Sequence, residues 1–385
     1  MNVCYWGTYD RDYPRNRIVM EGLRSQGVEV REMHFPLWGA SSEKVRRARG
    51  GWLSPLLLFR WMWAYASLGA RFLVARKPDF LFIGYSGHFD VFPAWCLSRL
   101  RGVPLVFDAF LSLYDSLVLD RGAMREGSFK ARLLAWIDRS SCRLADKVLL
   151  DTEAHVRFFC ERFDLPRGRF WVLPIGADDT VFKPAPLRAR NGHAYTVLHF
   201  GRYIPLHGLE TVVRAAALME GTGSDLRLRF LLVGEGEERP RIEALARELG
   251  VRSIEFKDAQ APVALAGMLR ESDVCLGIFG TTQKASRVVP NKVYEAMSAG
   301  RPVVTGDSPA AREYLQDGIN CLLCERGNPA SLAAAIRRMH DDAPLAAAIA
   351  ERGHRSFEEE AAPRVIGRIL TGRLAAWHNE HEHVA

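Results

Sequence analysis

Short apolar runs alternate along the chain with longer segments of helical spacing. Segments with an apolar residue every three or four positions include Asn16–Gln26 and Phe129–Leu144. Between such segments lie runs rich in Val, Ile, Leu and Phe, at Asn2–Trp6, Val28–Met33, Asp79–Tyr85, Pro104–Phe107, Lys147–Leu150 and Phe170–Leu173. Continuous apolar strands separated by helices predict a parallel sheet that is covered by helices on both faces.

A second series of the same kind follows a break in the pattern. The stretch from Pro184 to Gly192 has two prolines and no periodicity, so we expect a linker over 186–193. Strand candidates then recur at Tyr195–Phe200, Arg229–Val233, Ile254–Phe256, Asp273–Phe279, Pro302–Thr305 and Cys321–Cys324. The sequence therefore predicts an α/β protein with two doubly wound halves, 1–185 and 194–360, that face each other across a ligand cleft.

The last segment, 361–385, does not belong to either sheet. A helix is expected over Ala361–Trp377, as a candidate to pack back on the N-terminal half. A polar tail from His378 to His383 follows, and we expect it to be frayed rather than to hold a metal.

The composition is that of an ordinary globular chain of 385 residues, 48% apolar and 25% charged. That excludes a disordered or collagen-like protein. Lys and Arg exceed Asp and Glu by seven, and the whole excess lies in 43–77, where eight residues are basic and one is acidic. A nucleic-acid-binding protein would spread its basic residues over a whole face, so this distribution argues against a nucleic-acid partner.

The basic segment 43–77 contains a helical stretch, 52–75, that is rich in Trp and Leu. Arg60 and Arg71 interrupt it, which makes it too polar to span a membrane. On a helix these two arginines share one stripe with Ser67. Two interpretations stay open: a core helix with one solvated stripe, and a helix that lies in the interface of an anionic membrane.

The N-terminus and the cysteines indicate the compartment. The first ten residues, MNVCYWGTYD, show no basic region followed by an apolar one, so we expect no secretory signal. Seven cysteines, an odd number, favour reduced thiols and a cytoplasmic protein. Cys321 and Cys324 form a lone C-x-x-C, for which we expect core packing rather than metal or redox chemistry.

Candidate phosphate chemistry follows the first strand of the second half. The run Val197–Glu210 ends a strand, turns at Gly201 and begins a helix near Gly208. Loop amides and a helix N-terminus can bind an anion, and Arg202 adds a bidentate phosphate donor. The alternative is a βα turn that carries a surface arginine.

Two further glycine-containing turns come later in the second half. The G-x-G at Gly234 lacks the third glycine of the dinucleotide fingerprint, which argues against a nicotinamide enzyme and indicates a tight turn. The second turn lies within Gly277–Asp307, where a strand ends at Phe279 and a helix begins at Pro290. Glu295, one turn into that helix, could accept both hydroxyls of a ribose; the alternative is an exposed helix glutamate.

Together these pieces resemble the retaining glycosyltransferases of family 4, which have the GT-B fold. The resemblance is carried in order by Leu173-Pro-Ile-Gly-Ala-Asp178, Gly201-Arg202 with His207-Gly208, Val233-Gly-Glu-Gly236, Phe279-Gly280, and Pro290–Glu295 with Gly300-Arg-Pro-Val-Val304. It implies transfer of a sugar from a UDP- or GDP-linked donor, with the anomeric configuration kept and without a metal or other cofactor. In the family pattern the arginine at 202 binds the donor diphosphate and the glutamate at 295 binds the donor ribose.

The predicted donor-binding set comprises Gly201, Arg202, His207, Gly234, Phe256, Phe279, Gly280, Lys284, Arg287, Asn291, Lys292 and Glu295. Two of these positions depart from the family pattern. His207 stands where the family usually has Lys, and Arg287 stands where it often has a first glutamate that contacts the donor sugar. Lys284 and Lys292 are candidates to supply part of the phosphate-binding charge.

The N-terminal half is expected to hold the acceptor. Asp108 follows the apolar run Pro104–Phe107, and we predict that it orients the acceptor hydroxyl or stabilises charge at the reacting carbon. The alternative is a loop carboxylate that caps a helix. Asp108, Arg202 and Glu295 form the predicted catalytic set. The further acceptor-side candidates are Gly7, Thr8, Asp10, His88, Tyr114 and Glu153.

The sequence thus predicts a metal-independent retaining glycosyltransferase that acts on a lipid-linked or envelope glycan. We expect it in the cytoplasm, peripheral on the inner face of the cell membrane, with 43–77 as the candidate membrane contact. Two alternatives stay open. A nucleotide-sugar epimerase would share the fold but need no acceptor, and a non-catalytic protein would bind a nucleotide sugar without turnover.

Overall fold

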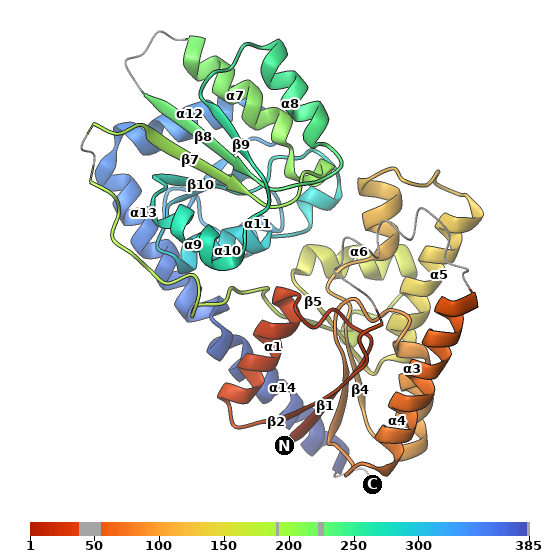
Figure 1. The fold of residues 1–385 in the computed structure, drawn as a ribbon. Helices are drawn as coiled ribbons and strands as arrows, with labels where there is room; N and C mark the ends of the chain where they lie inside the picture. Colours follow the sequence, from red (N-terminus) through yellow and green to blue (C-terminus); the bar gives the residue numbers. More distant parts are fainter. Residues whose placement is uncertain (38–54, 190–191, 222–226, 383–385) are drawn as a thin grey trace.

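The computed structural model describes residues 1–37, 55–189, 192–221 and 227–382. Within these residues the chain forms two separate six-stranded parallel sheets, one in each half (Figure 1). This confirms the predicted α/β class with two Rossmann-like sheets. The predicted residue ranges of the domains themselves stay a prediction.

The first sheet has the strand order β2-β1-β3-β4-β5-β6. Its strands are β1 (Asn2–Gly7), β2 (Glu29–His34), β3 (Phe80–Ile83), β4 (Leu105–Asp108), β5 (Lys147–Leu150) and β6 (Phe170–Val172). Strands β1, β3 and β4 are buried along their whole length, because helices cover both faces of the sheet. The predicted strands of this half all form, with ends that move by one or two residues.

Helices of the first half divide between the two faces of that sheet. Helix α1 (Pro14–Ser25) packs on one face, where Ile18, Val19 and Leu23 join the apolar residues of β1. The other face is covered by α3 (Pro55–Val74), α4 (Val91–Arg101), α5 (Phe129–Leu144) and α6 (Glu153–Phe163) (Figure 1). Shorter helical turns are the π-helical η1 (Asp115–Asp120) and the 3-10 turn η2 (Arg167–Arg169).

The second sheet has the strand order β12-β11-β10-β7-β8-β9. Its strands are β7 (Tyr195–Phe200), β8 (Leu228–Val233), β9 (Ile254–Lys257), β10 (Val274–Leu276), β11 (Val303–Gly306) and β12 (Leu322–Cys324). The strand order reverses between β7 and β10, and ligands of doubly wound sheets bind outside the carboxyl ends of the strands at such a switch point. The loops that follow β7 and β10 are therefore placed to form a site.

The helices of the second half surround this sheet. They are α7 (Leu209–Gly221), α8 (Arg239–Glu248), α9 (Pro262–Arg270), α10 (Asn291–Ser298), α11 (Ala311–Tyr314), α12 (Pro329–Asp341) and α13 (Ala343–Ser356), with the short turns η3 (Pro205–His207), η4 (Lys284–Ser286) and η5 (Phe357–Ala361). Cys321 and Cys324 are unpaired and buried beside β11. Their burial fits the expected core packing.

The last helix, α14 (Pro363–Glu382), runs back along the first half (Figure 1). It lies so close to α1 that a Cβ added to Gly367 would be 1.9 Å from the carbonyl oxygen of Gly22. Trp377 packs against the rings of Phe80 and Trp171 at centroid distances of 5.4 and 5.7 Å. The helix continues through Glu382, so the prediction of a frayed tail from His378 is wrong up to that residue.

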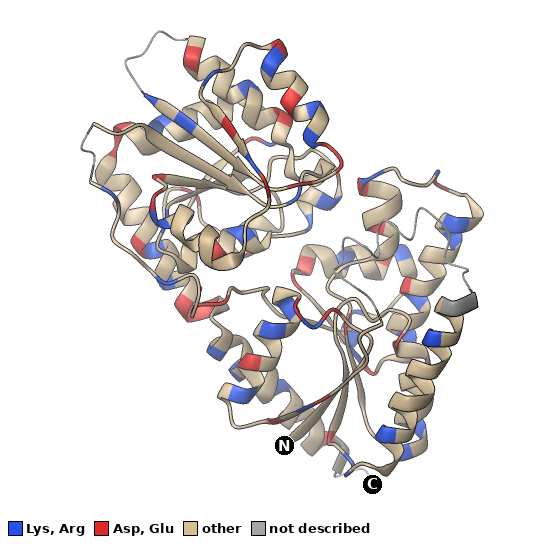
Figure 2. Cartoon of the chain, in the orientation of Figure 1, with Lys and Arg blue, Asp and Glu red and all other residues tan. Residues whose placement is uncertain are grey.

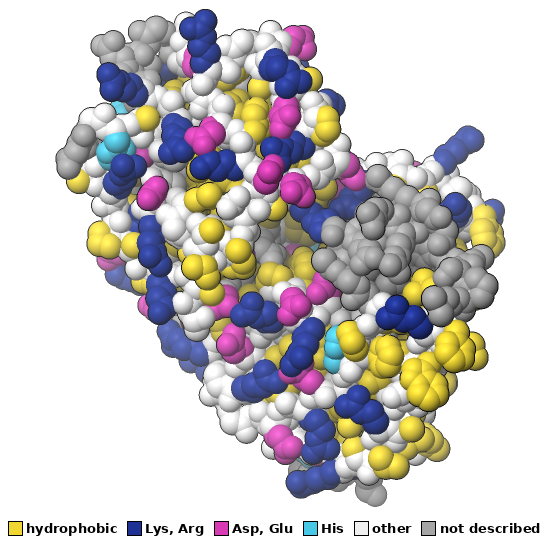
Figure 3. All heavy atoms as spheres, viewed as in Figure 1, with side chains coloured by type: hydrophobic (Ala, Val, Ile, Leu, Met, Phe, Trp, Pro, Cys, Tyr) yellow, Lys and Arg dark blue, Asp and Glu magenta, His cyan; other side chains and the backbone are white. Residues whose placement is uncertain are grey.

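Helix α3 is buried on one side and exposed on the other. Ala64, Leu68 and Phe72 are buried on the first sheet, whereas Met62 and Trp63 are 71% and 61% exposed. Hydrophobic side chains gather over α3 in Figure 3.

The basic cluster Lys44, Arg46, Arg47 and Arg49 lies outside the described residues. Charged residues of both signs are distributed over the two halves in Figure 2. Among the helices that the structure describes, none is long and apolar enough to cross a bilayer.

Candidate functional site

A cavity of about 440 Å³ lies between the carboxyl ends of the two sheets. From the second half, the predicted residues that line it are Gly201, Arg202, His207, Lys284, Asn291, Lys292 and Glu295. From the first half, Thr8 and His88 line it. The cavity therefore brings together the loops that follow β7 and β10 and the N-terminus of α10 with the opposite sheet.

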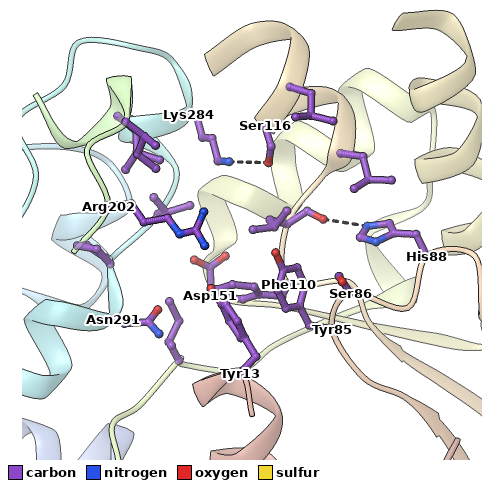
Figure 4. Close-up of a pocket in the computed structure, with 18 of the residues that line it drawn as sticks. Tyr13, Tyr85, Ser86, His88, Phe110, Ser116, Asp151, Arg202, Lys284 and Asn291 are labelled. Atoms are coloured by element: carbon purple, nitrogen blue, oxygen red, sulfur yellow. Dashed lines mark hydrogen bonds between the residues drawn. The ribbon is translucent and has the colours of Figure 1, made fainter. Parts of the chain in front are cut away.

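Arg202 directly follows the turn that ends β7. Gly201 has φ +125°, and a Cβ on Gly234 would lie 1.8 Å from the Gly201 carbonyl oxygen, so both positions require glycine. The close approach of these two turns holds Arg202 at the mouth of the cleft. Its guanidinium points into the cavity (Figure 4) and makes no hydrogen bond or ion pair with another described residue. It is thus free to bind an anion in a bidentate manner.

Lys292 lies in the buried wall beside Arg202, between two histidines. Its Nζ is 2.6 Å from Nε2 of His199 and 3.3 Å from Nδ1 of His207. Burial and the neighbouring Lys292 hold the pKa of both imidazoles well below the usual range, so both are neutral. Lys292 donates to one ring nitrogen of each histidine, and the His207 ring also hydrogen-bonds the backbone of Arg202. As an ammonium Lys292 has a third N–H for an anion; burial lowers the pKa of this group well below the usual range, and a bound anion would favour its charged form.

Glu295 is one helical turn beyond Lys292 on α10. Burial raises the pKa of its carboxyl to about 7, and the charge of Lys292 opposes that shift. Near neutral pH this carboxyl therefore exchanges its proton easily. As an ionised group it accepts hydrogen bonds with both oxygens, which suits a pair of vicinal hydroxyls.

Replacing Lys292 with methionine is expected to weaken binding of a nucleoside diphosphate by about 10- to 100-fold, the range for loss of a hydrogen bond to a charged group. Methionine keeps most of the apolar length of the side chain while it removes the charge. Isothermal titration measures the effect. Lys257→Met is the matched control, because Lys257 pairs with Glu255 on the edge strand β9 and lies away from the cavity. Equal affinity of K292M and wild type would contradict the assignment.

Three predicted donor residues support the site without lining it. Gly234 backs Gly201 as described above. The backbone N–H groups of Phe279 and Gly280 donate to the carbonyl oxygens of His207 and Leu206 at 3.0 and 3.2 Å, which fixes the turn η3. Phe256 lies on β9 and packs in the core of the second half. The structure does not support a donor contact for Phe256.

Arg287 turns away from the cavity. Its guanidinium donates to Oδ1 of Asp115 at 2.8 Å and lies 4.0 Å from the centre of the Phe158 ring, both in the first half. The structure therefore does not support the predicted position of Arg287 in the donor site. Its side chain instead crosses to the first half, because Asp115 pairs with its charge and the Phe158 ring packs against it. Lys284 also reaches across, donating to Oγ of Ser116 at 2.6 Å (Figure 4).

Two more contacts join the halves at the same place. Thr282 donates to Oδ1 of Asp120 at 2.9 Å. Both carboxylate oxygens of Glu313 accept at 2.7 Å from the backbone N–H groups of Glu153 and Ala154, at the start of α6. The loop around η4 and the helix α11 therefore hold η1 and α6 beside the cavity.

Asp108 is the main correction to the predicted site. It is fully buried at the end of β4 and pairs with the equally buried Arg15 of α1 at 2.8 Å. Arg15 also donates to the carbonyl oxygens of Leu173 and Pro174 at 2.9 and 2.5 Å. Asp108 does not line the cavity, so the structure assigns it to holding α1 on the sheet rather than to orienting an acceptor.

The other acceptor-side candidates divide into two groups. Thr8 and His88 line the cavity; Thr8 donates to Asp90 at 2.8 Å and His88 contacts the Leu111 carbonyl oxygen at 3.1 Å. The remaining four do not line it. Gly7 abuts Asp90, Asp10 caps a turn with Tyr13, Tyr114 is buried with its hydroxyl on Glu126, and Glu153 pairs with Arg167.

Several cavity residues were not predicted from the sequence. Tyr13, Tyr85 and Phe110 form an aromatic cluster with ring centroids 4.6 to 5.7 Å apart (Figure 4). Asp151 follows β5 directly and stands in the cavity opposite Arg202 (Figure 4). A polar residue immediately after a predicted buried strand is the signal that could have found it.

Comparison with known proteins agrees with this architecture. A model described as "Glycosyl transferase 4-like domain" matches residues 13–176, and one described as "Glycosyl transferases group 1" matches residues 194–342. The chain is 27% identical over 302 residues to a D-inositol 3-phosphate glycosyltransferase of Thermobispora bispora, across 74% of this chain and 68% of that one. It is 29% identical over 186 residues to the lipopolysaccharide core biosynthesis glycosyltransferase LpsE of Rhizobium meliloti, across 47% of this chain and 51% of LpsE.

The fold has a close counterpart among solved structures. The crystal structure of Anabaena HepE in complex with UDP-glucose matches with a TM-score of 0.69 at 17% identity, over 98% of this chain and 100% of that one. The two family models together span both halves, and the relatives are named glycosyltransferases. The chain therefore belongs to the GT4-like glycosyltransferases and has the GT-B fold.

Proposed function

We propose that this glycosyltransferase moves a sugar from a UDP- or GDP-linked donor to a hydroxyl of a lipid-linked or cell-envelope glycan, with retention of configuration and without a metal. The observation that carries the proposal is the free guanidinium of Arg202 beside Lys292 and Glu295, at the switch point of the second sheet. A nucleotide sugar presents a diphosphate and a ribose, which match these two cations and this carboxylate.

The donor fits the second half of the cavity in the following way. Arg202 and Lys292 bind the diphosphate, next to His207, and Glu295 accepts the ribose hydroxyls. Charge on the departing nucleoside diphosphate is then stabilised by fixed donors, the kind of interaction that contributes most to many enzymatic rates. The HepE structure, which contains UDP-glucose, supports a donor of this class for the same fold.

The acceptor fits the first half of the cavity, which is largely apolar. Trp61, Phe89, Leu111, Leu113 and Leu117 line it. An acceptor that enters there gains by burying an apolar part next to its hydroxyl, about 25 cal/mol for each Å² removed from water. The relation to a lipopolysaccharide core glycosyltransferase agrees with an envelope acceptor.

The protein would meet such an acceptor at the inner face of the cell membrane, through α3. Its exposed Phe59, Met62 and Trp63 are accompanied by the exposed Arg60 and Arg71, a composition that suits the surface of an anionic bilayer. Lipid-linked acceptors would then reach the cavity along the same side of the first half.

Replacing Phe59 and Trp63 together with serine should weaken binding to anionic liposomes at least tenfold, since each large side chain contributes roughly 1.5–3 kcal/mol when buried. A liposome co-sedimentation assay measures the effect. Leu218→Ser on α7 is the control, because Leu218 is 49% exposed but lies in the other half. Undiminished binding of the double variant would exclude this face of α3 as the contact.

A two-step experiment tests the proposed reaction. A thermal-shift screen of UDP- and GDP-linked sugars identifies the donor, because a bound donor stabilises the folded protein by mass action. NMR of the reaction with that donor and an acceptor panel then reports the anomeric configuration of the product, with and without EDTA. Retention in both conditions is expected. An inverted product, loss of activity in EDTA, or conversion of the donor to its epimer without an acceptor would each contradict the proposal.

A further inference from the structure

A carboxylate that the predicted site did not include stands inside the cavity. Asp151 directly follows β5, at the carboxyl edge of the first sheet, and is only 4% exposed. It lines the same cavity as Arg202. In Figure 4 its carboxylate faces the guanidinium of Arg202, with the aromatic side chains of Tyr85 and Phe110 nearby. Asp151 thus lies on the acceptor half, across from the group that would hold the leaving diphosphate.

One oxygen of Asp151 is fixed and the other is available. Oδ1 lies 2.7 Å from Nδ1 of His155, one turn along α6. His155 is itself fully buried, with Phe159 in edge contact at a centroid distance of 5.2 Å. Oδ2 is buried and makes no hydrogen bond with any residue that the structure describes. A buried carboxylate oxygen without a donor is unfavourable, so a polar group of a ligand that occupies the cavity is its natural partner.

The position of this oxygen indicates which part of the reaction it serves. The cations and the carboxylate that suit the nucleotide all come from the second half, whereas Asp151 comes from the first half, where the cavity becomes apolar. A hydroxyl that attacks the donor sugar has to lie between these two walls. A carboxylate there accepts a hydrogen bond from an O–H group and repels an anion, so it selects a hydroxyl with no phosphate or carboxylate beside it.

We propose that Oδ2 of Asp151 accepts a hydrogen bond from the acceptor hydroxyl and orients its oxygen toward the anomeric carbon of the donor. His155 is the positioning residue that holds the carboxylate in place. This inference rests on the proposed function. In the transfer step the acceptor oxygen forms a bond to the anomeric carbon while the bond from that carbon to the diphosphate oxygen breaks. The hydroxyl proton passes to the leaving diphosphate, and Asp151 takes up no proton in this step.

The test uses the full chain with the donor found by the thermal-shift screen. Asp151→Asn keeps the shape of the side chain but removes the charge, and Glu161→Gln is the control for the same kind of change on the exposed side of α6, outside the cavity. The acceptors are water, followed as release of nucleoside diphosphate without added acceptor, and the probe n-octyl β-D-glucoside. Donor affinity is measured by isothermal titration.

D151N is expected to lower both acceptor reactions about tenfold or more while donor affinity stays within about twofold, because orientation of a reacting group accounts for such factors. E161Q should behave as wild type. Reactions within twofold of wild type in D151N would overturn the proposal. A parallel loss of donor affinity would also overturn it, since Asp151 would then bind the donor. If wild type binds no nucleotide sugar at all, it is the proposed function that fails.

His155→Phe provides a second variant if D151N does not fold. Phenylalanine fills the same buried space but cannot donate to Oδ1. We expect a rise in KM for octyl glucoside and a several-fold fall in kcat, with unchanged donor affinity. A merely structural role for the pair would lower thermal stability and leave the KM of the folded enzyme unchanged, which would overturn the positioning role.

Discussion

Replacing Arg202 with alanine is expected to lower kcat/KM for the nucleotide sugar by about 10²- to 10³-fold, the range for loss of one fixed donor to developing negative charge. The guanidinium makes no hydrogen bond or ion pair with another described residue. Its removal therefore breaks no contact within the protein. Release of nucleoside diphosphate in a coupled assay measures the effect. Arg202→Lys should recover only part of the activity, because an ammonium cannot bind two phosphate oxygens as a planar fork does.

A matched variant controls for loss of a surface arginine. Arg214 on α7 pairs with Glu210 at 3.0 Å and lies outside the cavity, so Arg214→Ala should retain wild-type kinetics. Kinetics within threefold of wild type in R202A would place the diphosphate elsewhere.

Replacing Glu295 with glutamine should weaken binding of the nucleoside diphosphate by about tenfold at pH 8, the range for a lost hydrogen bond to a charged group. The carboxyl has a pKa raised to about 7, so in wild type it is mostly protonated at pH 6 and mostly ionised at pH 8. The ionised form accepts two hydroxyls. Wild-type affinity should therefore rise as the pH increases through 7, whereas E295Q should lack this rise.

The ionisable neighbours of Glu295 contribute differently to this pH dependence. His199 and His207 stay neutral across this interval, because burial and Lys292 hold their pKa values well below the usual range. Burial also lowers the pKa of Lys292, so at higher pH the loss of its charge opposes the gain from Glu295. Glu210→Gln on α7 is the control. The same pH dependence in E295Q and wild type would rule out Glu295 as the source.

The strands could be predicted closely from the sequence because both sheets are buried on both faces. A run such as Lys147–Leu150 is apolar without interruption, and the structure forms β5 over the same residues. The N-terminal boundaries of helices α5 and α12 could be predicted for a different reason. Ser128 and Asn328 are good N-cap residues, and their side chains cap these helices with hydrogen bonds. The end of α14 was not predictable, because its contacts with α1 come from the far end of the chain.

The site was predictable only where backbone turns and motif residues determine it. Arg202 and Glu295 are placed by the glycine turn after β7 and by the start of α10, both local features. Asp108 and Asp151 are indistinguishable in sequence, since each lies at the end of a buried strand. What separates them is Arg15, which lies 93 positions before Asp108 and neutralises it in the core. The direction of Arg287 likewise depends on Asp115, 172 positions away.

The most direct test of the central claim is a crystal structure of the protein with the nucleoside diphosphate of its donor. We predict a diphosphate bound between the guanidinium of Arg202 and Nζ of Lys292, with the ribose hydroxyls on Glu295. A nucleotide bound elsewhere, or in this cavity with its diphosphate away from Arg202, would contradict the account.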